Sequence, residues 1–394
     1  AQRHATRRAV KGLIAPGSTS EKRPPTHFAR RDESSNSPPR TIQVMADSPG
    51  LSLPQFDPAP IFDLFRANFA TELLVVAAAH LNVFGQLASG GLDRETLRAK
   101  LDLAERPFVV LTTALRAMQL LTLGVDGKLQ LTALAREHLA PGAPWDVGGY
   151  IGMAADAPGV REMFQRLVTN KPQGHADEQA PVGFIYRQGM PSAMEQEASA
   201  RRLTLALAGR AKNVAPVLAA RLPLDDARVL VDVGGGTGIY AIACLQRNPR
   251  LRAIVWDRPE VLKVAGEMAK QYGVADRLEL ASGDMFVDRV PEGADRLLLS
   301  NVLHDWDVAE CRELVARMAA ALPSGGRLLI HDVFLNDALD GPLAIALYSA
   351  ALFSVTEGRA YSAGEYAAWL SAAGLTPQPI VPTLIHCGVL AGVK

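Results

Sequence analysis

The pattern of apolar and polar positions changes at Arg228. From Ile61 onward, apolar residues recur every three to four positions, which is typical of amphipathic helices. After Arg228, short apolar runs alternate with helical stretches; the runs lie at residues 229–235, 253–257, 278–284, 296–305 and 327–334. This alternation predicts an α/β fold with a mainly parallel sheet covered by helices on both faces. The sequence therefore predicts an α-helical region followed by a Rossmann-like domain.

The helical region has the element order of a winged helix. Helices are expected at 92–101 and 106–121, followed by two short strands around the turn Asp126-Gly127. A DNA-recognition helix needs basic and polar side chains on its exposed face, but the 106–121 helix is largely apolar and its only basic residues are Arg106 and Arg116. We therefore expect it to be buried against another chain, in a homodimer.

Four segments follow from these patterns. Residues 59–144 are expected to form the winged-helix-like dimerisation domain and 145–222 a mostly helical region that contributes to a substrate pocket. Residues 223–394 form the α/β domain. Residues 1–58 are rich in Pro and Ser, with nine Lys or Arg against three Asp or Glu before Met45, and are expected to be disordered. Met45 is the expected start, and the residues before it are read as an extension or a targeting segment.

Composition narrows the classes of partner. The chain has 394 residues, with 41 basic and 41 acidic side chains, so its net charge favours neither nucleic acid nor a membrane surface. No apolar run reaches the length of a membrane span. Cys244, Cys311 and Cys387 fit no disulfide or zinc spacing, so we expect reduced thiols, a cytoplasmic location and no metal.

The first strand of the α/β domain leads into the glycine-rich segment VDVGGGTG, residues 231–238. A dinucleotide-binding fingerprint would place its third glycine at Ile239, where a branched side chain obstructs helix packing. The observed spacing is instead Asp232, Gly234, Gly236 and Gly238. A carboxylate ahead of the glycines would repel a pyrophosphate, but it suits the ammonium group of an amino acid. This spacing favours S-adenosylmethionine as the cofactor.

Further polar residues end the next strands. Asp257 ends the second strand, where its carboxylate can accept both ribose hydroxyls, and Asp284 ends the third, near the adenine edge. Met285 and Phe286 follow and can enclose the adenine ring. Ligands of open α/β sheets bind at these carboxyl ends. In the fourth run, Ser300 can hydrogen-bond the adenine; beyond it lie His304, near the expected methyl group, and Asp305, which helps to fix the turn.

These motifs resemble the plant-type small-molecule O-methyltransferase family, which includes caffeate, acetylserotonin and bacterial polyketide-tailoring enzymes. The similarity rests on VDVGGGTG, WDRPEV, GDMF, LHDWDVAEC and EYAAWLSAAGL, and it spans about residues 62–394. It implies a class I methyltransferase domain, an N-terminal dimerisation domain and His304 as the catalytic base. Asp332 matches one of two acids that orient this histidine, although it is shorter than the usual Glu.

The chain departs from the family pattern at two positions. The position of the second orienting acid is Ala360, unless Glu357 substitutes for it, and Ser300 replaces the usual basic residue. These departures resemble a bacterial branch of the family and weaken any transfer of plant substrate preferences.

The leading hypothesis is methylation of a hydroxyl on an aromatic or polyketide-like small molecule. One alternative is methylation of carbon, or a reaction without methyl transfer, on the same fold; another is a DNA-binding regulator. An apolar pocket is expected from Met153, Phe164, Phe184, Met190, Trp306, Leu347, Tyr348 and Phe353.

Overall fold

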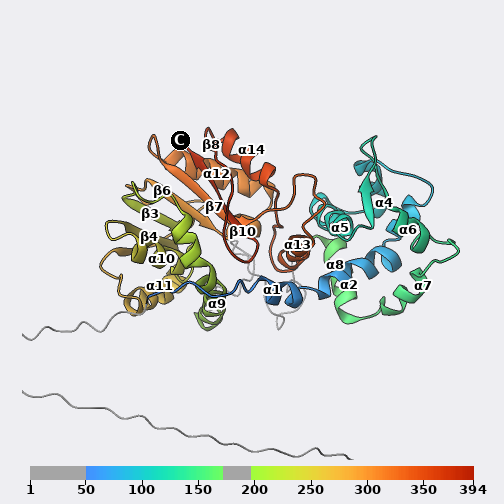
Figure 1. The fold of residues 1–394 in the computed structure, drawn as a ribbon, viewed down its shortest axis with the longest axis horizontal. Helices are drawn as coiled ribbons and strands as arrows, with labels where there is room; N and C mark the ends of the chain where they lie inside the picture. The colour runs from blue at the N-terminus through green and yellow to red at the C-terminus, as the bar shows by residue number, and fades with distance from the viewer. Residues whose placement is uncertain (1–49, 172–196) are drawn as a thin grey trace, which may run out of the picture. The chain divides into compact units, whose positions relative to one another are not determined.

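The computed structural model describes residues 50–171 and 197–394, which Figure 1 draws in colour. Residues 1–49 of the tail expected at 1–58, and the two pocket candidates Phe184 and Met190, lie outside the described residues. The expectation of disorder is wrong for residues 50–58, because Leu51 donates its N–H to Gln246 Oε1 (3.0 Å) and Asp57 accepts the N–H of Ile385 (3.1 Å). The domain boundaries after residues 144 and 222 stay predictions.

An α/β sheet forms the centre of the second part of the chain. Its strands, in spatial order, are β5 (Leu278–Ser282), β4 (Arg252–Asp257), β3 (Val229–Val233), β6 (Arg296–Ser300), β7 (Arg327–Val333) and β10 (Cys387–Val393), with β8 (Thr376–Pro377) and β9 (Val381–Pro382) paired to β10. The first five run parallel, and β10 is antiparallel to β7. The predicted α/β class with a mainly parallel sheet is confirmed.

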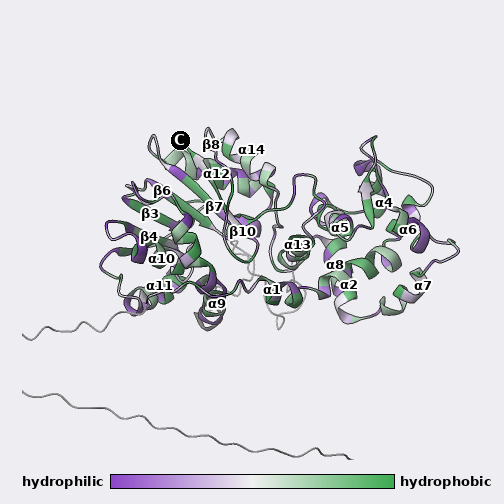
Figure 2. Ribbon diagram, in the orientation of Figure 1, coloured by the Kyte–Doolittle hydropathy of each residue, from purple (hydrophilic) through white to green (hydrophobic). Residues whose placement is uncertain are grey.

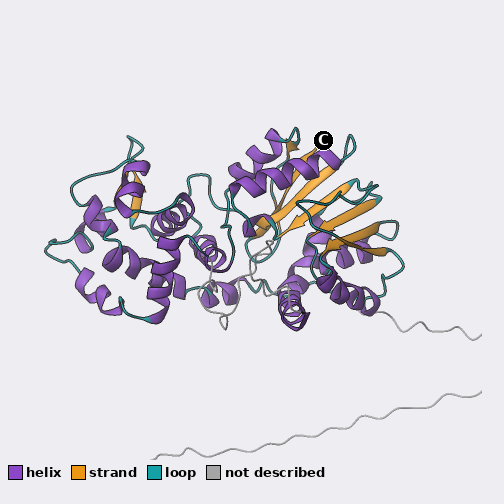
Figure 3. Cartoon of the chain, turned by 180° about the vertical axis from the view of Figure 1, so that it is seen from behind, coloured by secondary structure: helices purple, strands orange, loops and turns teal. Residues whose placement is uncertain are grey.

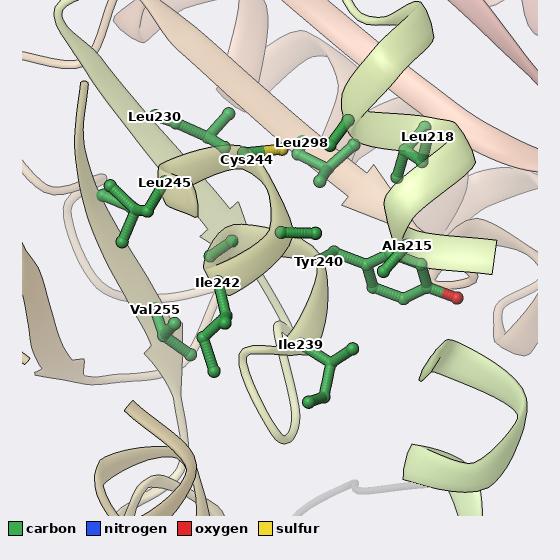
Figure 4. Close-up of a cluster of buried hydrophobic side chains, with 14 of the residues drawn as sticks. Ala215, Leu218, Leu230, Ile239, Tyr240, Ile242, Cys244, Leu245, Val255 and Leu298 are labelled. Carbon is green, nitrogen blue, oxygen red and sulfur yellow. The ribbon is translucent and has the colours of Figure 1, made fainter. Parts of the chain in front are cut away.

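Helices cover both faces of this sheet (Figure 3). One face packs against α9 (Glu197–Arg221), α10 (Ile239–Arg247) and α11 (Pro259–Gln271), and the other against α12 (Val308–Ala321) and α14 (Ala363–Ala372). Figure 4 shows part of the first layer, where Leu230 and Leu298 of the sheet lie near Cys244 of α10 and Leu218 of α9. Strands with apolar residues on both faces are buried, which explains their continuous apolar runs.

Four of the strands end before their apolar runs do: β3 at Val233 and β7 at Val333, and β5 and β6 as follows. The prediction of a strand over 296–305 is wrong beyond Ser300, because Asn301 turns the chain with a φ of 56° and a 3₁₀ turn at Leu303–Asp305 follows. Asn tolerates this left-handed conformation better than most residues. Similarly, β5 ends at Ser282 rather than at Asp284. Both chain segments therefore leave the sheet at its carboxyl edge and present their polar residues there.

The N-terminal part is helical. Its elements are α1 (Ala59–Phe65), α2 (Asn68–Val75), a π-helical turn (Val76–His80), α3 (Val83–Leu87), α4 (Arg94–Leu101), α5 (Glu105–Ala117), β1 (Leu121–Leu123), β2 (Leu129–Leu131), α6 (Ala133–His138), α7 (Gly148–Ile151), a 3₁₀ turn (Gly152–Ala154) and α8 (Pro158–Thr169). The prediction that α5 buries its apolar face against another chain is wrong, because α5 packs against α2, α8 and α13 of its own chain.

The helix α13 (Leu343–Val355) is mostly apolar, with Tyr348, Ser349 and Ser354 as its polar side chains, and Figure 2 draws it mainly in green. It packs against α5 and α2, which explains why no polar face is needed. Although α13 is mostly apolar, neither it nor any other helix in the described ranges is long and apolar enough to cross a membrane. A cytoplasmic location stays a prediction.

The buried side chain of Arg106 fastens α5 to the loop that follows α13. Its Nη1 donates to the carbonyl oxygens of Thr356 (2.9 Å) and Gly358 (3.2 Å), and its Nε donates to Asn170 Oδ1 (2.9 Å). The guanidinium lies 4.6 Å from the ring centroid of Phe353. Burial lowers the pKa of Arg106 to about 10, so the group stays charged at neutral pH. The loop that carries Gly358 is therefore held in place.

Candidate active site

The glycine-rich loop between β3 and α10 has a backbone that few other residues could adopt. Gly234, Gly236 and Gly238 have φ values of 63°, 59° and 69°, in the left-handed region that favours glycine. A Cβ on Gly238 would lie 3.1 Å from Val255 Cγ2, whereas a Cβ on Gly236 would meet no atom within 4 Å. The loop thus packs tightly on the sheet at Gly238 and borders open space at Gly236.

The carboxylate of Asp257 lies beside this loop. One of its oxygens accepts the N–H of Gly236 (2.8 Å) and the other accepts the N–H of Arg258 (2.7 Å). Burial raises the pKa of Asp257, and these two hydrogen bonds oppose the shift. Asp257 also lines the cavity described below, so the remaining lone pairs of its carboxylate are available to a ligand's hydroxyl groups.

Asp232 lies beneath the loop rather than in the cavity wall. Its side chain is fully buried, and neither carboxylate oxygen has a hydrogen-bond partner among the described residues. Burial raises the pKa of Asp232 to about 7, and the charge of Asp257 adds to the shift. A Cβ on Gly235 would lie 2.8 Å from its Cγ. An unsatisfied buried carboxylate is costly, which is consistent with a role towards a cationic ligand.

The residues expected near adenine divide into two groups. Met285 and Ser300 line the cavity, whereas Asp284 and Phe286 do not. Asp284 accepts the N–H of Phe286 (2.9 Å) and pairs with Arg258 (3.2 Å), so it shapes the turn after β5. The ring of Phe286 meets the buried ring of Trp306 edge-on, with centroids 4.8 Å apart.

Ser300 belongs to a buried polar chain at the end of β6. Its Oγ lies 2.8 Å from Nδ1 of His331, whose Nε2 lies 3.1 Å from Oγ1 of Thr383. The Nδ2 of Asn301 donates to the same Ser300 oxygen. Burial lowers the pKa of His331 to about 3, so this imidazole is neutral and joins β6, β7 and the segment before β10.

A cavity of about 910 Å³ borders the glycine loop and His304. Its wall includes side chains of α1, α9 and α13 as well as the loops at the carboxyl edge of the sheet. This volume is within the range for drug-sized ligands, and the site lies where ligands of open α/β sheets bind.

His304 and Asp332 form a buried pair at this cavity. Nδ1 of His304 lies 2.6 Å from Oδ1 of Asp332. Asp332 is held by the N–H of Val333 (2.8 Å) and the hydroxyl of Tyr366 (3.1 Å). Burial lowers the pKa of His304, but the carboxylates of Asp332 and Asp305 raise it more, so the net shift is upward. The structure therefore brings Asp332 into hydrogen-bond contact with His304, and its orienting role stays a prediction.

The second carboxylate that faces His304 is Asp305. Its Oδ1 lies 3.6 Å from Nε2 of His304, and burial raises the pKa of Asp305 to about 6. The sequence analysis assigned Asp305 only to the turn. Its position directly after His304 did not indicate that the two side chains are in contact. Glu357 donates its backbone N–H to the carbonyl of Asp305 (3.2 Å), and Ala360 is fully buried.

Most of the described residues that were expected in the pocket do not line the cavity. Trp306 and Tyr348 line the cavity. Met153 is 77% exposed, and the ring of Phe164 stacks on His80 at 4.6 Å. Leu347 and Phe353 are buried but do not line the cavity, because α13 turns those positions away from it.

The sequence missed the polar residues that the helices contribute to the wall, Arg66, Arg210 and Thr204. Arg66 follows α1, while Arg210 and Thr204 lie on α9. An arginine in a helical run usually indicates a solvated face, so nothing in the pattern marked these residues. Among the described residues, no three His, Cys, Asp or Glu side chains gather so that they could hold a metal ion.

A glycine loop at the carboxyl edge of such a sheet, with a carboxylate after the next strand, defines an enzyme class that binds adenosine-containing cofactors. A family model of the O-methyltransferase domain matches residues 176–376. A 3-hydroxy-5-methyl-1-naphthoate 3-O-methyltransferase of Streptomyces sahachiroi is 34% identical, covering 86% of this chain and 95% of the relative. This chain therefore belongs to the O-methyltransferase family.

Two further similarities extend the comparison. The crystal structure of an O-methyltransferase family 2 protein of Planctomyces limnophilus in complex with apigenin is 50% identical, with a TM-score of 0.78, covering 87% of this chain and 98% of that one. An L-tyrosine C(3)-methyltransferase of Streptomyces lavendulae is 28% identical, covering 77% of this chain and 82% of the relative.

The cofactor of this family is S-adenosylmethionine. The residues present fit it: the loop offers open space at Gly236, Asp257 lines the cavity, and the buried carboxylate of Asp232 lacks a hydrogen-bond partner in the described chain. Oxygen acceptors suit the hydroxyl and ammonium groups of this molecule.

Substitution of Gly358 tests whether the loop after α13 must pack closely on the turn that carries His304. A Cβ at this position would lie 2.1 Å from the carbonyl oxygen of His304 and 2.6 Å from the amide nitrogen of Trp306. We expect Gly358→Ala to displace His304 and to lower kcat by at least about 10-fold, since small misplacements of a reacting group are costly. Cofactor affinity, measured by calorimetry, should change little.

Gly149→Ala is the matched control, because a Cβ at Gly149 would meet no atom within 4 Å. Circular dichroism and thermal melting should establish that both variants are folded. A folded Gly358→Ala protein with unchanged kcat would contradict the proposed role of this packing.

Proposed function

We propose that this protein transfers a methyl group from S-adenosylmethionine to a hydroxyl of an aromatic or polyketide-like small molecule, with His304 as the general base. The observation that carries the proposal is the buried His304–Asp332 pair in the wall of the cavity that adjoins the glycine loop. The hydroxylated aromatic acceptor in the name of the naphthoate methyltransferase supports the acceptor class.

The cofactor is proposed to bind at the carboxyl edge of the sheet, where it supplies a methyl group bound to a positively charged sulfur. Its ammonium group is assigned to Asp232, directly or through water, its ribose to Asp257, and its adenine to the segment Asp284–Phe286 and to Ser300. The glycines at 234, 236 and 238 let the backbone approach it closely. The side chains of Asp284 and Phe286 act on this pocket through the turn that they shape.

His304 is proposed to remove the proton of the acceptor hydroxyl. A phenol has a pKa near 10, so at neutral pH it is mostly protonated and a weak nucleophile. Asp332 accepts a hydrogen bond from Nδ1 of His304, which leaves the lone pair on Nε2 for the acceptor proton. Asp332 and Asp305 then stabilise the imidazolium that forms. Proton removal by a positioned base typically contributes about 10²- to 10⁴-fold in rate.

Methylation of carbon is the second candidate. The L-tyrosine C(3)-methyltransferase among the relatives supports carbon methylation as an alternative reaction. Removal of a phenol proton by His304 would also increase the nucleophilicity of the ring carbons. The two reactions therefore use the same base and differ in which acceptor atom faces the cofactor.

We infer that residues 59–144 form a winged-helix-like domain that joins two copies of the chain. The order α3, α4, α5, β1 and β2 supports the domain type. Apolar side chains on α1 support an interface, since Ile61 and Leu64 are 69% and 78% exposed. Light scattering should give the mass of a dimer, and the double variant Ile61→Glu, Leu64→Glu should give a monomer; a monomeric wild type would refute the inference.

His304→Gln tests the base directly. We expect kcat for a phenolic acceptor to fall by about 10²- to 10⁴-fold, while the dissociation constant of S-adenosylhomocysteine stays within about 3-fold. His80→Gln is the control, because His80 stacks on Phe164 and does not line the cavity. An unimpaired rate in His304→Gln would rule out the base assignment.

The pH dependence of kcat/KM tests the electrostatics of the pair. A base must be deprotonated, so activity is lost as the pH falls through the pKa of His304. Because the two carboxylates raise this pKa above its ordinary 6.5, the acidic limb should lie above pH 6.5. Asp332→Asn removes one of these charges, so the limb should move to lower pH by about one unit while kcat falls. If the acidic limb of Asp332→Asn lies at the same pH as that of the wild type, the proposed electrostatic coupling between Asp332 and His304 is contradicted.

A further inference from the structure

Two arginines of the cavity wall have no acidic ion-pair partner among the residues that the structure describes. Arg66, after α1, and Arg210, on α9, both line the cavity. Among the described residues, neither forms an ion pair, and the side chain of Arg66 donates no hydrogen bond. The nearby carboxylate of Asp63 is bound instead to Nε2 of His386 (2.9 Å).

Both guanidinium groups face the ring of Tyr348. The Cζ of Arg66 lies 3.8 Å from the ring centroid, and the Cζ of Arg210 lies 6.0 Å from it. The imidazole of His304 meets the same ring edge-on, with centroids 5.7 Å apart. The base and both cations therefore neighbour the same aromatic side chain, so one molecule with one or two rings can reach all three.

Arg210 is only partly satisfied within the chain. Its Nη1 donates to Oδ1 of Asn301 (2.9 Å) and its Nη2 to Sγ of Cys387 (3.1 Å), while its buried Nε has no partner among the described residues. The hydroxyl of Thr204, also in the cavity wall, is buried and has no hydrogen-bond partner in the part of the chain that the structure describes. Arg66 is only 7% exposed, and burial lowers its pKa although it remains charged. Two sparsely bonded cations in one enclosed space repel each other and favour an anion between them.

We propose that Arg66 and Arg210 bind the carboxylate of a hydroxylated aromatic acid whose hydroxyl lies at His304. A guanidinium presents N–H groups in a fork that matches a carboxylate, and the ring of Tyr348 provides a face for the acceptor's aromatic part. This inference rests on the proposed function, because it assigns the acceptor of the same site. The two other arginines of the cavity wall are already paired, Arg166 with Glu162 (2.9 Å) and Arg258 with Asp284 (3.2 Å), and are not part of the carboxylate site.

Calorimetry on the full chain saturated with S-adenosylhomocysteine tests the proposal without depending on turnover. The probes are two matched pairs, 3-hydroxy-1-naphthoate with its carboxamide and 3-hydroxybenzoate with its carboxamide. In the wild type, at least one acid should bind at least about 10-fold more tightly than its amide. Arg66→Gln and Arg210→Gln should each abolish most of this preference, and Arg66→Lys should retain part of it. Arg166→Gln should leave the ratio unchanged.

A second measurement distinguishes binding of the acceptor's carboxylate from binding of the cofactor's carboxylate, because an arginine can bind either group. The affinity of each variant for S-adenosylhomocysteine alone should stay within about 3-fold of the wild type. If both substitutions weaken S-adenosylhomocysteine and leave the acid-to-amide ratio unchanged, the arginines hold the cofactor and the proposal is overturned. A wild type that prefers neither acid also overturns it.

Methylation of the same probes distinguishes this inference from the proposed function. If acids bind in an arginine-dependent way but no probe is methylated, the carboxylate site stands and the proposed reaction fails. If acid and amide are methylated with equal kcat/KM and bind equally, the proposed reaction stands and the carboxylate site is refuted. Circular dichroism should verify that each variant is folded; Arg210→Lys replaces Arg210→Gln if the latter is not.

Discussion

The short hydrogen bond between His304 and Asp332 is the interaction on which the rest of the site depends. It forms because β6 and β7 are parallel neighbours, so the turn after one and the last residues of the other meet at the same edge of the sheet. Tyr366 of α14 holds the second oxygen of Asp332, and the loop at Gly358 packs on the turn that carries His304. A buried pair of this kind is favourable only when such additional hydrogen bonds and packing complete it.

Charged groups of both signs line the cavity together with His304. The carboxylate of Asp257 adjoins the glycine loop, while Arg66 and Arg210 lie beside Tyr348. The turn before His304 reaches the loop as well, since a Cβ on Gly234 would lie 3.2 Å from Val302 Cγ2. On this account, a cationic methyl donor and an anionic acceptor are oriented by opposite charges, and their reacting groups meet at the base.

The sequence predicted the parallel sheet and the cofactor loop because both depend on local patterns. Apolar runs located the five parallel strands, and the glycine spacing after Asp232 located the loop. The residues that are proposed to bind the acceptor could not be predicted from local sequence patterns. Tyr348 and Phe353 lie on one apolar helix, and only the packing of that helix decides that Tyr348 faces the cavity while Phe353 lies against Arg106. Arg66 and Arg210 come from separate helices, and Asp305 contacts His304 only because Asn301 turns the chain.

The most direct test of the account is the identity of the bond that the transferred methyl group forms. The enzyme would be incubated with S-adenosylmethionine labelled with ¹³C at its methyl group and with a hydroxylated aromatic acceptor, and the product would be examined by NMR and mass spectrometry. The account predicts a single labelled methyl group with the carbon shift of an aryl methoxy group. A labelled methyl group on a ring carbon, or an acceptor hydroxylated without gaining the label, would contradict it.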